Sequence, residues 1–89
     1  MKKILVVCGN GLGTSLMMEI AVKEVVEKMG LEAEVDHEDL SSAASSQADI
    51  WVAAADIAVQ LQEAGKENII SLINIFDKAS IEEQLKAFI

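Results

Sequence analysis

The chain has 89 residues, of which 52% are apolar, and its formal charge at pH 7 is −8. This length predicts one domain over residues 1–89, and the apolar share excludes a disordered tail. Seven lysines, no arginine and three aromatic side chains make nucleic-acid binding a poor fit. The acids are concentrated after residue 31, which is typical of a solvated acidic surface. The alternative is that the nearly neutral first third faces an acidic or phosphorylated partner.

The chain offers no signal for membrane insertion, a disulfide or a metal. No apolar run reaches the ~18 residues of a membrane helix, and the apolar run after Lys3 is too short for a signal peptide. We therefore expect a cytoplasmic protein with no direct membrane insertion. One cysteine excludes an internal disulfide, and one cysteine with one histidine cannot supply the four ligands of structural zinc. We expect no metal and no cofactor.

A strand, a glycine-rich turn and a helix open the chain. Residues 3–8, Lys-Ile-Leu-Val-Val-Cys, form a continuous apolar run that predicts a strand buried on both faces. Three glycines in residues 9–13 then require a sharp turn. Thr14 or Ser15 is a suitable N-cap for an amphipathic helix, which the apolar spacing predicts over residues 16–29. Gly30 is placed to end the first helix, whose charged positions 19, 23, 24, 27 and 28 are expected to face solvent.

Two further strands are predicted in the middle of the chain. Residues 31–38 alternate apolar and charged side chains, as in a half-buried edge strand. Residues 40–47 hold four serines and permit a short helix or a loop. Residues 50–54 predict an interior strand with Trp51 in the core.

The last third of the chain predicts helix, strand and helix. Asp56 is expected to cap a helix that runs to about Ala64 and is closed by Gly65. Residues 69–73 predict a fourth strand. Residues 80–83, Ser-Ile-Glu-Glu, have the pattern of a capping box that opens the last helix. The side chains expected to face inward from that helix are Ile81, Leu85 and Phe88.

Strands that alternate with helices predict an α/β, Rossmann-like fold with a four-stranded parallel sheet and helices on both faces. The uncharged runs 4–8 and 50–54 are the natural central strands, and the charged run 31–38 belongs at an edge. This gives the sheet order 2-1-3-4. Ligand crevices of such sheets lie at the carboxyl ends of the strands, beside the switch point between the first and third strands. Cys8, the last residue of the first strand, is therefore predicted to lie in that crevice.

The loop after Cys8 has the composition of an anion cradle. Glycines let backbone N–H groups converge without interference from Cβ atoms, and a helix N-terminus follows. The same positive field should lower the pKa of a thiol at the rim and favour the thiolate. A loop that stabilises a thiolate also suits a phosphoryl group attached to it, so one structure can provide both nucleophile and oxyanion site.

Better-known phosphate loops do not match this segment. A Walker A loop needs a lysine after its last glycine, and none lies between residues 4 and 22. A dinucleotide fingerprint would need glycine where Thr14 stands. A thiol phosphatase needs arginine at that position, so hydrolysis of a phosphorylated thiol should be slow. A small thiol phosphatase, an arsenate-reductase-like enzyme and a non-catalytic anion-binding module nevertheless stay open as alternatives.

Residues 4–15, Ile-Leu-Val-Val-Cys-Gly-Asn-Gly-Leu-Gly-Thr-Ser, resemble the start of IIB components of the bacterial sugar phosphotransferase system (PTS). The ascorbate type is most similar, and the lactose and galactitol types are close behind. The resemblance covers nearly the whole chain, although residues 38–47 are hard to align. Its weaker matches are Ala48-Asp49-Ile50, Asn74 and Phe76-Asp77.

The resemblance implies a phosphocarrier that acts as a protein-phosphohistidine–sugar phosphotransferase. Its cysteine takes phosphate from a phosphohistidine of the IIA component and passes it to an ascorbate-like or galactitol-like sugar held by the membrane IIC component. Such a carrier would be a cytoplasmic monomer that docks transiently at the inner face of the membrane through IIC. Carried over by position, Cys8 is the nucleophile. The implied phosphate-binding residues are Gly9, Asn10, Gly11, Leu12, Gly13, Thr14 and Ser15, the last two through their hydroxyls.

Other residues near the predicted crevice have plainer interpretations. His37 is interpreted as a hydrogen-bonded edge histidine rather than a proton-transfer group. Asp56 is interpreted as a helix cap rather than part of a partner surface. Met18 is expected in the core, whereas Leu12 and Met17 could form an adaptable apolar rim for successive partners.

Overall fold

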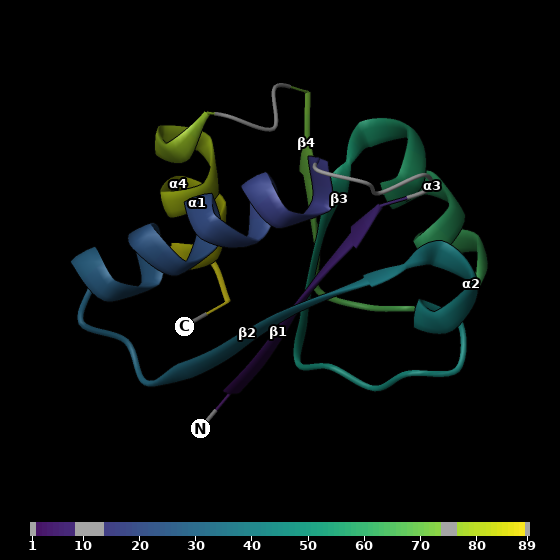
Figure 1. Ribbon diagram of the computed structural model, residues 1–89. Coiled ribbons are helices and arrows are strands. Elements are labelled where there is room, and N and C mark those ends of the chain that lie inside the picture. The colour runs from purple at the N-terminus through teal and green to yellow at the C-terminus, as the bar shows by residue number, and fades with distance from the viewer. Residues whose placement is uncertain (1, 9–13, 74–76, 89) are drawn as a thin grey trace.

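The computed structural model describes residues 2–8, 14–73 and 77–88, and within them strands and helices alternate along the chain (Figure 1). This alternation confirms the predicted element order. The elements are β1 (Lys2–Cys8), α1 (Thr14–Lys28), β2 (Ala33–Asp39), α2 (Leu40–Ala43), β3 (Ile50–Ala54), α3 (Ala55–Glu63), β4 (Ile69–Leu72) and α4 (Lys78–Lys86).

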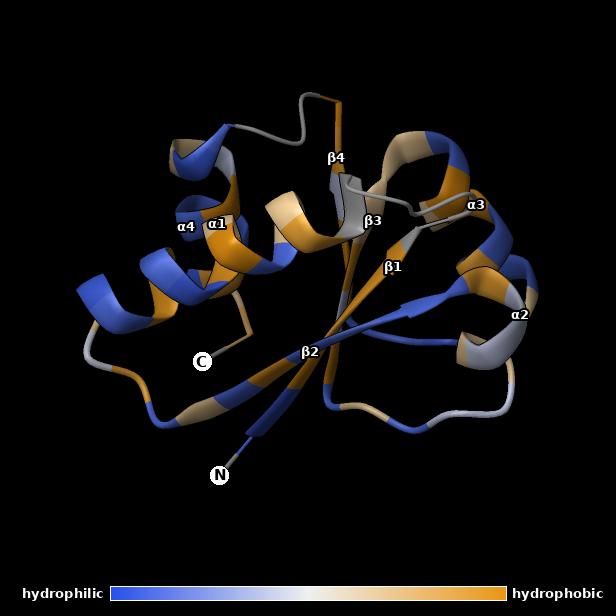
Figure 2. Ribbon diagram, in the orientation of Figure 1, coloured by the Kyte–Doolittle hydropathy of each residue, from blue (hydrophilic) through white to orange (hydrophobic). Residues whose placement is uncertain are grey.

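The four strands form one parallel sheet in the order β2-β1-β3-β4, as predicted. The central strands β1 and β3 are apolar along most of their length, whereas β2 at the edge is largely hydrophilic (Figure 2). Burial explains this order, because a strand with neighbours and helices on all sides cannot keep charges hydrated. In the register of β1 and β2, Val6 lies opposite His37 and Cys8 lies opposite Asp39.

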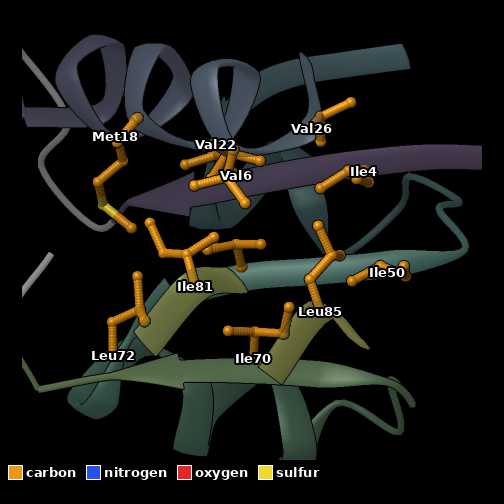
Figure 3. Packing of buried hydrophobic residues seen from close by; sticks show 13 residues of the cluster. Ile4, Val6, Met18, Val22, Val26, Ile50, Ile70, Leu72, Ile81 and Leu85 are labelled. Atoms are coloured by element: carbon orange, nitrogen blue, oxygen red, sulfur yellow. The ribbon is translucent and has the colours of Figure 1, made fainter. Parts of the chain in front are cut away.

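Helices cover both faces of the sheet, with α1 and α4 on one face and α2 and α3 on the other (Figure 1). On the first face, long aliphatic side chains from the strands meet those of α1 and α4 (Figure 3). Among them, Val22 and Leu85 are fully buried. The predicted core position of Met18 and the inward positions of α4 are confirmed, with Ile81 and Leu85 buried and Phe88 packed at the margin. Val22 and Val25 of α1 are buried beside Met18.

The second face has a smaller, alanine-rich core. Its buried residues from the strands are Leu5, Val7, Trp51 and Ala53. The helices α2 and α3 contribute buried Ala43, Ala58 and Leu61, with Leu40 and Ile57 at the margin. Trp51 is 3% exposed, which confirms the prediction of a core position. The Lys66 ammonium lies 4.9 Å from the Trp51 ring centroid and donates to carbonyls at the end of α2. The side chain of Lys66 therefore packs over Trp51 at the edge of the alanine-rich core.

Two helices end at the glycines that the sequence predicted. Gly30 and Gly65 adopt positive φ values of 68° and 87°. After α1, the Gly30 N–H donates to the Glu27 carbonyl and the Leu31 N–H donates to the Val26 carbonyl, each at 3.1 Å. This pair of bonds is a Schellman motif, which occupies carbonyls that the helix end leaves without partners.

Replacing Gly30 by alanine should therefore destabilise the fold by about 1 kcal/mol, because an L side chain disfavours positive φ. No heavy atom lies within 4 Å of a Cβ built at this position, so the cost would come from the backbone alone. Urea unfolding of G30A and G30N measures the effect. Asparagine tolerates this conformation, so G30N should lose clearly less stability than G30A, and equal losses would contradict the explanation.

The predicted helix starts were wrong by one to three residues. Helix α1 begins at Thr14, so Thr14 and Ser15 lie within the helix rather than at its cap. Helix α3 begins at Ala55 after the N-cap Ala54, so Asp56 lies in the first turn and does not cap. Helix α4 is capped by Asp77, whose side chain accepts from the Ser80 N–H at 3.1 Å. In each case an earlier residue begins the helix, so the predicted cap lies inside it.

The strand limits also differ slightly from those predicted. Strand β2 spans 33–39 rather than 31–38, because the Gly30 turn takes up the first residues and Asp39 completes the pairing with Cys8. Strand β4 ends at Leu72, and Ile73 beyond it is 99% exposed. The serine-rich segment contributes the four-residue helix α2, one of the two structures that its composition permitted.

Candidate functional site

The end of β1 and the start of α1 meet at the carboxyl edge of the sheet. Strand β1 ends at Cys8 and α1 begins at Thr14, and Figure 1 shows both at the same end of the molecule. In the observed strand order the switch point lies between β1 and β3, which is where parallel sheets of this kind bind ligands. The N-terminus of α1 carries a partial positive charge of about half an elementary charge. The backbone thus places Cys8 at the predicted crevice edge.

The predicted phosphate loop itself lies largely outside the described residues. Gly9, Asn10, Gly11, Leu12 and Gly13 all belong to that part of the chain. Cys8, Thr14 and Ser15 are described by their backbone, as the end of β1 and the first turn of α1. The roles assigned to these eight residues therefore remain predictions.

A carboxylate lies opposite Cys8 in the sheet, and it is turned toward a helix. Asp39 caps α2, because its Oδ1 accepts from the Ser42 N–H at 2.8 Å and from the Ser41 hydroxyl at 3.2 Å. The backbone and side-chain hydrogen bonds from Ser42 are the main cause of a lowered pKa of Asp39. The carboxylate of Asp39 therefore stabilises the N-terminus of α2, although Asp39 pairs with Cys8 beside the predicted anion site.

The lowered pKa of Asp39 makes its contribution to stability dependent on pH. The folded protein holds the carboxylate better than the unfolded chain does, so the contribution is complete above the ordinary value of 3.8 and is lost as the pH falls below it. Asp39→Asn keeps a cap acceptor but does not titrate. We expect wild type to unfold at higher urea concentration than D39N at pH 7, with the difference shrinking toward pH 3. A constant difference would contradict the assignment.

Exposed apolar side chains lie beside this edge. Leu16 and Met17 in the first turn of α1 are 49% and 52% exposed, and Ile73 follows the end of β4. Farther along α1, Ile20 is 48% exposed and lines a shallow groove of about 230 Å³ with Met17 and α4's Lys78. Met18 is fully buried as predicted. Met17 fits the predicted rim, to which the structure adds three members that the sequence reading missed.

Glu19 differs most from its sequence interpretation. It was assigned to the solvent face of α1, yet it is 6% exposed. Its Oε1 lies 2.9 Å from Nδ1 of His37, and its Oε2 lies 3.6 Å from the Lys23 ammonium. His37 is therefore a hydrogen-bonded edge histidine, as interpreted. The spacing of Glu19 to Val22 and Val26, at three and seven residues, was the available sign that it shares their side of the helix.

The described residues include one group with metal-ligand chemistry. Single ligand atoms of Glu19, Asp36 and His37 lie within 4.8 Å of one another. However, His37 and Lys23 already pair with Glu19, and the Oδ1 of Asp36 accepts from the His37 backbone N–H at 2.8 Å. These interactions account for the arrangement, so we assign no metal to it.

The weaker sequence matches fall at structural positions. The Lys3 N–H donates to the Asp49 carboxylate at 2.7 Å, and the Asp49 N–H donates to the Lys3 carbonyl at 2.9 Å. This reciprocal pair joins the starts of β1 and β3 at the edge opposite Cys8. Asp77 caps α4, whereas Asn74 and Phe76 lie outside the described residues.

Comparisons with known proteins point to one family. Residues 3–87 match the family described as the lactose/cellobiose-specific IIB subunit of the PTS. Two similar relatives are ascorbate-specific PTS EIIB components. The one from Mycoplasma pneumoniae is 26% identical, and the alignment covers 92% of this chain and 88% of the relative. The one from Salmonella typhimurium is 28% identical, and the alignment covers 93% of this chain and 84% of the relative.

A solved structure supports the fold independently. The lactose-specific IIB domain of the Streptococcus pneumoniae PTS aligns with 97% of this chain and 92% of its own, with a TM-score of 0.64 and 17% identity. None of the helices in the described ranges has the length and apolar character needed to span a membrane. The parallel sheet, the position of Cys8 at its switch point and the match over residues 3–87 lead to one assignment: this chain belongs to the IIB family of the sugar phosphotransferase system.

Proposed function

We propose that this IIB protein carries phosphate on Cys8 between a IIA component and a sugar held by a IIC component. Membership of the family supports the general role in sugar phosphotransfer. The observation that carries the finer proposal is the position of Cys8, which ends β1 at the switch point where α1 begins. A thiolate at this position would be stabilised by the positive field of the helix N-terminus. In this proposal residues 1–89 form one phosphocarrier domain.

The chemistry divides into two in-line displacements. In the first, the Cys8 thiolate attacks phosphorus of the IIA phosphohistidine. An S–P bond forms, the P–N bond breaks, and the imidazole nitrogen keeps the electron pair. In the second, a sugar hydroxyl oxygen attacks the same phosphorus, the S–P bond breaks, and the thiolate is restored. The hydroxyl proton passes to a base or water at the sugar site.

The predicted loop would supply charge stabilisation in both steps. Amides of residues 9–13 and the hydroxyls of Thr14 and Ser15 are neutral donors, and they suit a phosphoryl group that must leave again. The chain contains no arginine, so no guanidinium clamp can stabilise attack by water. This composition favours a carrier over a thiol phosphatase.

The surface beside Cys8 suits partners that bind in turn. Leu16, Met17, Ile20 and Ile73 provide exposed apolar area around the carboxyl edge. Flexible apolar side chains such as methionine can repack against different surfaces. We propose that a monomeric, cytoplasmic protein presents this edge first to IIA and then to IIC at the inner face of the membrane. Ascorbate-like sugar acids are the first substrates to test, because the two relatives described above are named for ascorbate.

The function is tested by following phosphate. The protein is incubated with phosphoenolpyruvate, the general PTS proteins and an ascorbate-type IIA component, and the phosphorylated residue is mapped by mass spectrometry. We expect one phosphoryl group on Cys8 and its transfer to ascorbate when IIC membranes are added. Phosphate on another residue, or none with any IIA type, would overturn the proposal.

A second assay separates the carrier from the alternative enzyme. The protein is incubated with p-nitrophenyl phosphate alone, and nitrophenol is measured over many turnovers. A carrier should give no steady release, because it lacks the groups that activate water. Continuous turnover lost in a Cys8 variant would instead identify a thiol phosphatase.

A further inference from the structure

A buried carboxylate in α1 needs an explanation that core packing does not give. Glu19 lies in the second turn of α1, and its side chain is 8% exposed. Burying a carboxylate is costly unless charged or hydrogen-bonding groups compensate it. Lys23 offers weak compensation, since its ammonium is 3.6 Å away and its side chain is 55% exposed. The close partner is His37, at 2.9 Å.

This contact joins α1 to β2 just behind the proposed site. His37 lies opposite Val6, and Asp39, two residues later, lies opposite Cys8. Glu19 is five residues from the start of α1, which is less than two helical turns. The Glu19–His37 bond therefore fixes the first turns of the helix against the strand pair whose far end carries Cys8.

We propose that Glu19 and His37 are positioning residues that hold the N-terminus of α1 in place beside Cys8. This role requires no contact with the phosphate or the thiol. In this role their bond sets where the positive end of the helix lies, and that field would favour the thiolate and stabilise the phosphoryl group. This inference rests on the proposed function and assigns the pair a role in the same site.

Neighbouring charges define what a test must control. Glu19 faces Lys23 on its own helix, and on β2 it faces His37, with a carboxylate oxygen of Asp36 nearby. Removing the negative charge of Glu19 would, by direct electrostatics, favour the thiolate. Loss of positioning would disfavour it. The two effects therefore have opposite signs, which makes the test decisive.

Glu19→Gln and Glu19→Leu remove the same charge, but glutamine keeps an oxygen that can accept from His37. The readout is the rate at which iodoacetamide alkylates Cys8 between pH 5 and pH 9, together with the rate of phosphate uptake from phosphorylated IIA. We expect E19L to lower both rates roughly tenfold at pH 7 and to shift the alkylation profile to higher pH. E19Q keeps the bond and loses only the charge, so its rates should match or exceed those of wild type. Glu27→Leu, an exposed charge on the same helix, is the matched control and should behave as wild type.

A second pair of variants approaches the bond from β2, in case E19L does not fold. His37→Asn keeps a donor near the position of Nδ1, and His37→Ala removes it. The side chain of His37 is 42% exposed, so both variants should fold. We expect H37A to slow both reactions and H37N to restore most of the rate.

Each outcome decides the inference. Equal acceleration in E19Q and E19L would show a direct charge effect, and unchanged rates in E19L and H37A would show that the pair contributes to stability alone; either result overturns it. Phosphate uptake by the wild-type protein distinguishes failure of the proposed function from failure of the positioning role. If wild-type Cys8 takes no phosphate, the proposed function fails, whereas normal uptake that is insensitive to the pair contradicts only the positioning role.

Discussion

Replacing Cys8 by serine is expected to abolish phosphate transfer to the sugar. A serine hydroxyl remains protonated at neutral pH even beside a helix N-terminus, and it lacks the nucleophilicity of a thiolate. Removing a nucleophile of this kind lowers the rate on the order of 10³-fold or more. The measurement is the initial rate of sugar phosphorylation with IIA, IIC membranes and phosphoenolpyruvate, with C8S in place of wild type.

The control for this experiment is stability. Serine differs from cysteine by one atom, so C8S should unfold close to the wild-type urea concentration and give the same circular dichroism spectrum. Transfer by a folded C8S protein at the wild-type rate would show that the phosphate is carried elsewhere. If C8S is inactive because it does not fold, the C8A variant takes its place. The proposal then requires that C8A folds and is inactive.

The largest effect on stability is expected for Leu61→Ala. Leu61 is fully buried in α3, and the other buried helical residues of its cluster are the alanines Ala43 and Ala58. Neighbours this small cannot fill the space that leucine leaves, so the variant pays for a cavity as well as for lost burial. We expect a loss of roughly 2–5 kcal/mol in the free energy of unfolding. That is a large part of the 5–15 kcal/mol typical of a whole domain.

Val59→Ala gives the matched control on the same helix. Val59 is 53% exposed, so its truncation should change the free energy of unfolding by less than about 0.5 kcal/mol. Urea denaturation followed by the fluorescence of Trp51, which belongs to the same core, reports both variants. Similar losses in L61A and V59A would contradict the view that the alanine-rich face depends on this leucine.

The order of the sheet was predictable because burial constrains composition. A strand between two others under helices cannot carry charges in its interior. The uncharged β3 and β1, whose only charges are Lys2 and Lys3 at its start, therefore had to be central, and the charged β2 had to lie at an edge. The ends of α1 and α3 were predictable because a left-handed residue is nearly always glycine, as at Gly30 and Gly65.

Helix starts were harder to predict because several side chains can serve as caps. Asp77 and Ser80 both have suitable acceptors, and the backbone entering α4 selects the aspartate. The burial of Glu19 depends on His37, eighteen residues later, and the two meet only after β2 pairs with β1. Local periodicity holds no information on such a contact. The fold places Cys8, but the roles of the loop residues still rest on chemistry and resemblance.

The direction of β1 has a practical consequence for handling this protein. The strand runs from Lys2 to Cys8, so the chain enters the sheet roughly 20 Å from the backbone of Cys8, at the opposite end of the molecule (Figure 1). An affinity tag, fluorophore or surface tether joined ahead of Lys2 would therefore leave the carboxyl edge unobstructed. Immobilisation through that end should allow binding of the proposed IIA and IIC partners to be measured on one sensor.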